Sequence, residues 1–113
     1  MRRTILLLSL VIFLFSCGVV DNTESSGTYS LNQNYPNPFD GMTHISYYIG
    51  TPGHAHLIVR NTNQQEIARL VDGDITEGEH SVIFDAQSLS SGAYPYTLTV
   101  NDFSATKQMI LIR

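Results

Sequence analysis

The sequence has no tryptophan and a single cysteine, and both shortages limit how the chain can be stabilised. The lone cysteine, Cys17, cannot form an internal disulfide, so no such cross-link holds a small domain together. Without tryptophan, the hydrophobic core has to be built from isoleucine, leucine, valine, tyrosine and phenylalanine. We therefore expect a single domain of modest size whose stability rests on packing alone.

Basic residues are also scarce, with six lysines and arginines against ten acidic residues and a net charge of −4. Arg2 and Arg3 stand at the N-terminus, so the rest of the chain has four basic and ten acidic residues, a net charge of −6. A surface of this sign repels phosphate backbones and anionic headgroups. The composition therefore predicts that nucleic acid is not a partner, and it argues against electrostatic binding to a membrane.

A long hydrophobic run is missing as well. The longest predominantly apolar stretch, residues 5–15, has eleven residues, whereas a membrane-spanning helix needs about 20. Arg2 and Arg3 precede this stretch and a small residue, Ser16, follows it, which is the layout of a secretory signal peptide. We expect residues 1–16 to be that signal peptide.

Cys17 follows the predicted signal peptide directly. The sequence Leu14-Phe15-Ser16-Cys17 resembles the lipobox of bacterial lipoproteins, in which the cysteine is acylated and becomes the first residue of the mature protein. An unmodified thiol beside an ordinary cleavage site is the alternative, but acylation better explains an odd cysteine in an exported chain. Residues 17–28 are small and polar, so we expect a lipidated Cys17 on a flexible tether ahead of a domain at residues 29–113.

Helical periodicity is absent beyond residue 29, where apolar residues alternate with polar ones in short runs. Such alternation is typical of strands with one buried face. Turn-forming residues separate the runs at 50–53, 61–64, 72–73, 77–78 and 90–92. The pattern predicts an all-β fold, an antiparallel immunoglobulin-like sandwich of about seven strands, with a partly open barrel as the alternative. Pro95 predicts an edge strand or a bulge. Met109–Ile112 is apolar on both faces, which is typical of a strand covered on both sides.

Chemistry-bearing residues form no recognisable catalytic pattern. The serines lack a Gly-x-Ser-x-Gly elbow, and the acidic residues at 72–79 lack the order of an EF-hand loop. His54 and His56 lie on one face of a predicted strand, but a catalytic zinc ion needs three ligands and no carboxylate shares that strand. We therefore expect solvated histidines, with His80 hydrogen-bonded at a turn. The sequence predicts no catalytic residue, no metal or other cofactor, and no small-molecule substrate.

A series of short motifs runs through the predicted domain, and together they resemble the type A C-terminal sorting domain of the type IX secretion system. The first is the segment that contains Asn34, Tyr35, Pro36, Asn37, Pro38 and Phe39, and the ordered series is more specific than any one motif. Further motifs are Leu70-Val71-Asp72-Gly73, Glu77-Gly78-Glu79-His80, Phe84-Asp85-Ala86, Ser91-Gly92-Ala93-Tyr94 and the final segment from Thr106 through Lys107, Met109 and Leu111 to Arg113.

This resemblance implies an immunoglobulin-like sandwich, related to a domain of flagellar hook-capping proteins, that is not an enzyme. In the family, the export machinery recognises the domain, and a sortase-like protease often removes it. The resemblance indicates Asn34–Phe39, Gly78, Gly92 and Tyr94 as motif residues. If the domain is a sorting signal, the docking residues would be strand-edge backbone and the terminal segment, with Lys107, Met109, Leu111 and Arg113.

The sequence thus indicates a non-enzymatic envelope lipoprotein whose body is a sorting domain recognised for export or surface attachment. Its partners would be the secretion machinery and, through the N-terminal lipid, a membrane. It would lie in the outer membrane or at the cell surface, or otherwise be secreted. The alternative is a structural adhesion or assembly module that binds an envelope protein by strand-edge pairing. Residues 35–39 are expected to form an ordered lid over one end of the sandwich.

Overall fold

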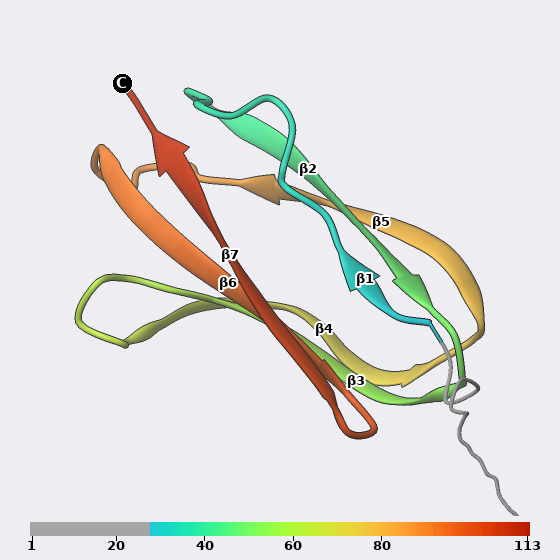
Figure 1. The fold of residues 1–113 in the computed structure, drawn as a ribbon. Coiled ribbons are helices and arrows are strands. Elements are labelled where there is room, and N and C mark those ends of the chain that lie inside the picture. Colours follow the sequence, from blue (N-terminus) through green and yellow to red (C-terminus); the bar gives the residue numbers. More distant parts are fainter. Residues whose placement is uncertain (1–27) are drawn as a thin grey trace, which may run out of the picture.

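The computed structural model describes residues 28–113, which form two facing antiparallel sheets (Figure 1). The predicted signal peptide, Cys17 and all of the predicted tether except its last residue lie outside this range. No helix occurs in the described part, and so none there could span a membrane. The strands are β1 (Ser30–Leu31), β2 (Met42–Ile49), β3 (Gly53–Arg60), β4 (Glu66–Ile75), β5 (Gly78–Asp85), β6 (Gly92–Val100) and β7 (Phe103–Leu111).

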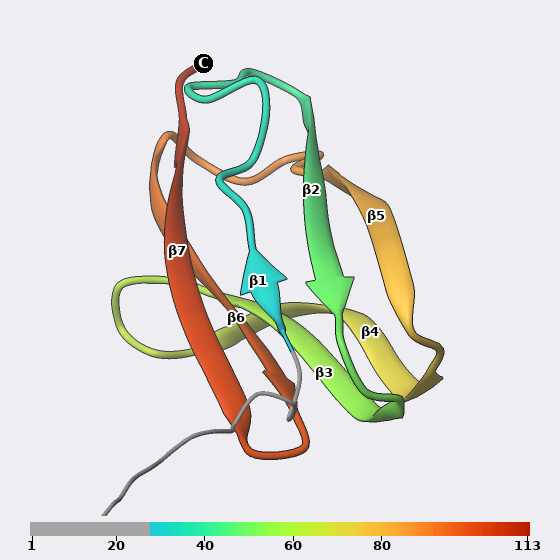
Figure 2. The same cartoon turned by 45° about the vertical axis from the view of Figure 1, so that its right-hand side comes forward.

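The strand order identifies the type of sandwich. One sheet has the order β1-β2-β5 and the other β4-β3-β6-β7, as the two views of the ribbon show (Figures 1 and 2). In immunoglobulin domains the first, second and fifth strands share one sheet, and the third, sixth and seventh share the other. The same division holds here, with the fourth strand paired to the third. The predicted antiparallel sandwich of seven strands is therefore confirmed, and the barrel alternative is wrong.

The core lies between the sheets and is built by the alternation seen in the sequence. Each run contributes every second side chain to the interior, because successive side chains of a strand point to opposite faces. The fully or almost fully buried residues include Ile45, Tyr47 and Ile49 of β2, Ala55, Leu57 and Val59 of β3, and Tyr94, Tyr96, Leu98 and Val100 of β6. Two phenol groups are satisfied by main-chain carbonyls.

The first of these phenols forms a corner typical of immunoglobulin-like folds. The hydroxyl of Tyr94, at the start of β6, donates a hydrogen bond of 2.7 Å to the carbonyl oxygen of Ser90, four residues earlier. A tyrosine at this place that bonds back to the preceding corner is a feature of these sandwiches. The second phenol, of Tyr96, donates to the carbonyl oxygen of Asn32 at 2.7 Å and so fixes the chain that leaves β1.

One predicted turn is wrong. Asp72 and Gly73 lie inside β4, where Gly73 pairs with Ala55 of β3, and the chain turns only after Ile75. The ladder with β3 satisfies this backbone, and β4 is the outermost strand of its sheet, where a glycine costs little packing. The turns predicted at 50–53, 61–64 and 77–78 are found with shifts of one or two residues at their ends, whereas the turn predicted at 90–92 belongs to a longer loop that begins at Ala86.

Pro95 lies in a strand that is not at the edge, because β6 runs between β3 and β7. The pairing of β6 with β3 ends at Tyr96, however, so Pro95 has a partner only on the β7 side, where it faces Gln108. The register between β6 and β7 shows no bulge. The prediction of an edge strand is therefore wrong for β6 as a whole, but Pro95 occupies a position that lacks a neighbour on one side.

Candidate functional site

The motif segment, residues 34–39, forms a loop between β1 and β2 at one end of the sandwich. Asn34 is 2% exposed, and its side-chain amide donates to the carbonyl oxygen of Pro36 at 3.1 Å and to Oγ1 of Thr43 at 2.9 Å. The hydroxyl of Thr43, which is also buried, donates in turn to the Pro36 carbonyl at 2.8 Å. Buried polar groups need such partners. The network holds the loop closed, and the peptide bonds that precede Pro36 and Pro38 are both cis.

Phe39 and Asn37 join the motif segment to the outer edge of β7. The amide of Phe39 donates to the carbonyl oxygen of Ile110 at 3.0 Å, and its carbonyl accepts from the amide of Ile112 at 2.8 Å. The side-chain oxygen of Asn37 accepts from the amide of Ile110 at 2.9 Å. The motif segment therefore acts as a short parallel neighbour of the last strand.

This join changes the expectation of docking through the backbone edge of the last strand. The side-chain amide of Gln33 also donates to the carbonyl oxygen of Gln108 at 2.7 Å. Main-chain groups on the outer edge of β7 are thus occupied from Gln108 to Ile112 by the chain itself. An added strand cannot pair there unless the motif segment leaves, so in this structure the backbone edge of that segment is closed to a partner.

The four predicted docking residues divide into two pairs. Met109 is 0% and Leu111 1% exposed, because both side chains point into the core. They hold β7 in place, and a partner cannot touch them in the folded domain. Lys107 and Arg113 are exposed. Of the four predicted docking residues, only Lys107 and Arg113 therefore have side chains that a partner could contact.

Lys107 is exposed for an unexpected reason. It pairs with the buried Tyr96 in the continuous register of β6 and β7, so it lies on the same, inward face as Met109. That side of the sandwich is open because β1, which would cover it, is only two residues long. An inward-facing charge on an edge strand discourages unwanted strand pairing. Lys107 therefore lies at the open side between the sheets, not on the outward polar face of β7.

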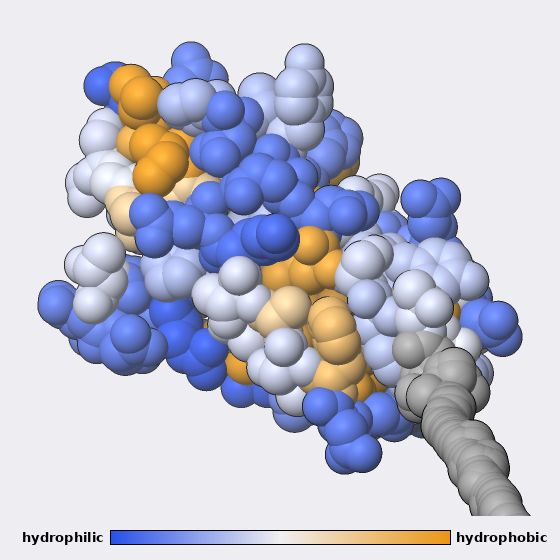
Figure 3. Space-filling model, in the orientation of Figure 1, coloured by the Kyte–Doolittle hydropathy of each residue, from blue (hydrophilic) through white to orange (hydrophobic). Residues whose placement is uncertain are grey.

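Exposed apolar side chains gather around the join between the motif segment and β7. Tyr35 is 79%, Met42 58% and Ile112 55% exposed. A shallow hollow at this end of the sandwich is lined by Pro36, Pro38, Phe39, Asp40, Met42 and Ile112. Hydrophobic residues are visible near the end of β7 on the face drawn in Figure 3. Sequence reasoning took the apolar Ile112 for a covered residue and missed this surface.

The remaining motif residues begin strands. Gly78 opens β5 with φ at 119° and Gly92 opens β6 with φ at 155°. A backbone in this region disfavours any residue with a Cβ atom, so the glycines serve the turns that precede the two strands. Tyr94 forms the corner described above. These three residues support the fold and are not grouped at one functional surface.

The histidines and acidic residues singled out in the sequence lie in several places. His80 behaves as predicted: its Nε2 donates to the carbonyl oxygen of Thr76 at 2.8 Å, and its ring stacks on Tyr47. His54 and His56 lie on the outward face of β3. Their own strand has no carboxylate, as the sequence indicated, but Asp72 reaches both histidines from the neighbouring β4.

The model of the family described as the secretion system C-terminal sorting domain matches residues 33–112. The chain belongs to this family. The resemblance predicted from the motif series is thereby confirmed, and the sorting domain covers the whole sandwich except its first few residues. No curated protein and no solved structure matches the chain significantly.

Membership of the family gives the chain a role in type IX secretion. A sorting domain interacts with the secretion machinery and directs export to the cell surface or out of the cell. The structure adds that the two ends of the sorting domain, residues 34–39 and the end of β7, meet in one place.

Proposed function

We propose that this chain is an envelope lipoprotein, attached through an acylated Cys17, whose sorting domain is recognised at the end where residues 34–39 meet β7. The observation that carries the recognition part is the set of hydrogen bonds that join Phe39 to Ile110 and Ile112, and Asn37 to Ile110. Because of these bonds, the two segments that the family motifs mark lie side by side. We call the exposed side chains there, Tyr35, Met42, Ile112 and Arg113, together with Lys107 at the open side farther back along β7, the recognition surface.

The composition of the recognition surface supports this proposal. Its centre is apolar, with Tyr35, Met42 and Ile112 each more than half exposed. The two cations add positive charge to a domain that is otherwise acidic. Interfaces typically combine an apolar centre, often with tyrosine and methionine, with a polar rim. Lys107 and Arg113 would steer an acidic partner surface towards the apolar centre.

We also propose that the chain catalyses no reaction. Nucleophilic catalysis needs a hydroxyl or thiol within hydrogen-bond reach of a base. Between residues 28 and 113, no serine or threonine hydroxyl is hydrogen-bonded to a histidine. This observation supports a binding role for the sorting domain.

The recognition surface is tested with a secreted reporter fused ahead of residues 29–113 in a host that has a type IX system. We expect the wild-type fusion to reach the cell surface. The double variant Lys107→Ala/Arg113→Ala should stay in the periplasm while its circular dichroism spectrum remains that of a folded domain. A wild-type fusion that never leaves the periplasm would favour the adhesion or assembly alternative.

The matched control is Arg60→Ala/Arg69→Ala, which removes the same charge from β3 and β4. Arg69 forms ion pairs with Glu66 and Asp72, but exposed pairs of this kind contribute little to stability, because water and salt screen them. This control should therefore fold and be exported. Equal retention of both double variants would mean that net charge, not the recognition surface, decides export.

The lipid anchor is tested separately. Cells fed radiolabelled palmitate should incorporate label into the wild-type chain and not into Cys17→Ser, because acylation requires the thiol. Fractionation should then find the variant released from membranes. Equal labelling of both proteins would exclude acylation at Cys17 and leave the sorting role untouched.

A further inference from the structure

Two histidines and two aspartates form a compact square on the outward face of the second sheet. His54 and His56 are two residues apart on β3, so both point to the same face. In the ladder with β4, His54 pairs with Asp74 and His56 with Asp72. Residues directly opposite in an antiparallel pair have neighbouring side chains. The sequence hides this grouping, because Asp72 lies 18 residues from His54.

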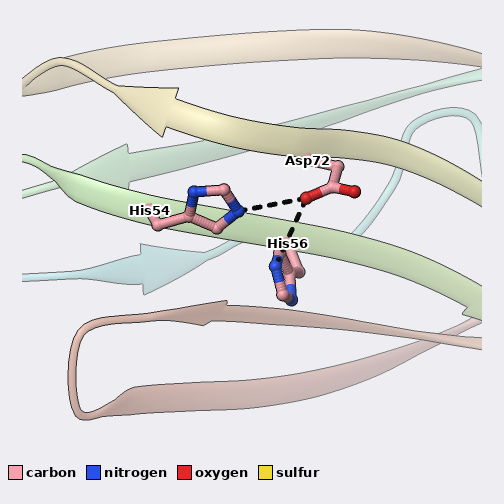
Figure 4. Close-up of side chains that lie close together, drawn as sticks. All are labelled: His54, His56 and Asp72. Carbon is pink, nitrogen blue, oxygen red and sulfur yellow. Dashed lines mark hydrogen bonds and ion pairs between the residues drawn. The ribbon is translucent and has the colours of Figure 1, made fainter.

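The side-chain atoms already lie at the spacing of metal ligands. Oδ1 of Asp72 is 3.1 Å from Nε2 of His54 and 3.3 Å from Nε2 of His56, and Figure 4 shows both rings turned towards this oxygen. Ligands placed tetrahedrally about 2.0–2.1 Å from a zinc ion are about 3.3 Å apart. The ligand atoms of the three residues all lie within 4.8 Å of one another. Small rotations of the two imidazoles would shorten the longest of these distances to the spacing of zinc ligands.

Outer contacts orient two of the three side chains. Oδ1 of Asp74 lies 3.5 Å from Nδ1 of His54, and its negative charge favours a proton on that nitrogen, which would leave Nε2 for a metal. Metal-binding histidines almost always have such a carboxylate or carbonyl partner. Arg69 holds the other oxygen of Asp72, Oδ2, at 3.4 Å and leaves Oδ1 pointing at the histidines.

We propose that His54, His56 and Asp72 bind one divalent transition-metal ion of the Zn²⁺ class. The ion takes the place of the proton that Nε2 of His54 shares with Asp72, so binding to a protonated ring releases that proton. Two imidazoles and one carboxylate suit zinc, copper and nickel ions better than calcium or magnesium. Three protein ligands leave a fourth position for water or for a side chain of a partner. The bound ion ties β3 to β4, independently of the recognition surface.

Zinc binding to the full chain in detergent, without a polyhistidine tag, tests the proposal. Every protein carries Cys17→Ser, so that the thiol adds no binding. Equilibrium dialysis with elemental analysis should find one zinc ion per wild-type chain at submillimolar zinc. His54→Gln and Asp72→Asn should each weaken binding by at least tenfold. The control His44→Gln, which changes an exposed histidine of the other sheet, should bind as the wild type does.

Two further measurements do not depend on how the variants fold. In the wild-type protein, zinc below stoichiometry should shift the imidazole resonances of His54 and His56 and leave that of His80 unchanged. Saturating zinc should raise the midpoint of thermal unfolding by several degrees, because a ligand that binds only the native state stabilises it. In the dialysis experiment, the further variant Asp74→Asn should weaken zinc binding less than His54→Gln and Asp72→Asn do, because Asp74 orients His54 and does not bind the ion.

Three results would overturn the proposal. The first is the absence of bound zinc at submillimolar concentration. The second is binding that His54→Gln and Asp72→Asn leave unchanged. The third is binding that His44→Gln weakens as strongly as those variants, since the ion would then lie elsewhere.

Discussion

Replacing Phe39 by alanine measures how far the motif segment belongs to the folded core. The side chain is 4% exposed, and its ring meets that of Phe84 edge to face with 6.4 Å between the centroids. Truncation of a buried phenylalanine to alanine costs about 3–5 kcal/mol, and the lost aromatic pair places the value in the upper half of that range. A domain of this size has an unfolding free energy of about 4–13 kcal/mol.

Urea denaturation followed by far-ultraviolet circular dichroism gives the change directly. With a slope near 1 kcal/mol per molar urea, a loss of about 4 kcal/mol lowers the midpoint by roughly 4 M. The matched control is Tyr35→Ala in the same motif. Its side chain is 79% exposed, so its unfolding free energy should change by no more than about 0.5 kcal/mol. A loss below about 1.5 kcal/mol for Phe39→Ala would refute the placement of this ring in the core.

Two further predictions concern titration. Burial raises the pKa of Tyr96 to about 12, so in an alkaline titration followed by absorbance this tyrosine should ionise well above the ordinary tyrosine value of 10. The contribution of protonated Tyr96 to the free energy of unfolding is complete below pH 10, the ordinary tyrosine pKa. It is lost as the pH rises towards 12, because this tyrosine loses its proton at lower pH in the unfolded chain than in the folded one. Ionisation of Tyr96 near 10 would contradict this. The hydrogen bond from His54 and the charge of Arg69 lower the pKa of Asp72, so its contribution to stability is present at neutral pH and lost as the pH falls through the depressed pKa. In metal-free protein, NMR titration should show a higher pKa for Asp72 in His54→Gln than in the wild type, and an unchanged value would contradict the assigned cause.

The strands of the core could be predicted because their signal is local. From Ile45, Ala55 and Tyr94 onward, every second residue of β2, β3 and β6 is apolar, and the pleat turns these residues to one face. The turn predicted at Asp72-Gly73 failed because β3 supplies partners from elsewhere in the chain, and local turn propensity loses to a continuous ladder. The inward-facing position of Lys107 could not be predicted, since its exposure on that face depends on the shortness of β1 on the other sheet.

The candidate sites show the same division. The family motifs indicated the right segments, 34–39 and the end of β7, but their contact joins residues 73 positions apart. The spacing of His54 and His56 was visible, whereas their carboxylate neighbour depends on the register between β3 and β4. A shift of that register by one residue would turn Asp72 to the other face of the sheet. Pairing across strands is therefore what the sequence alone could not supply.

The recognition surface forms only when the motif segment and the end of β7 are both present and folded together. A ribosome that has made residues 34–39 has not yet made Ile110 and Ile112, on which the placement of Phe39 and Asn37 depends. A truncated or misfolded domain would carry one of the two motifs without the other beside it. Secretion machinery that recognises both motifs together would export only molecules in which the sorting domain has folded. The recognition surface would then select for folded protein as well as direct export.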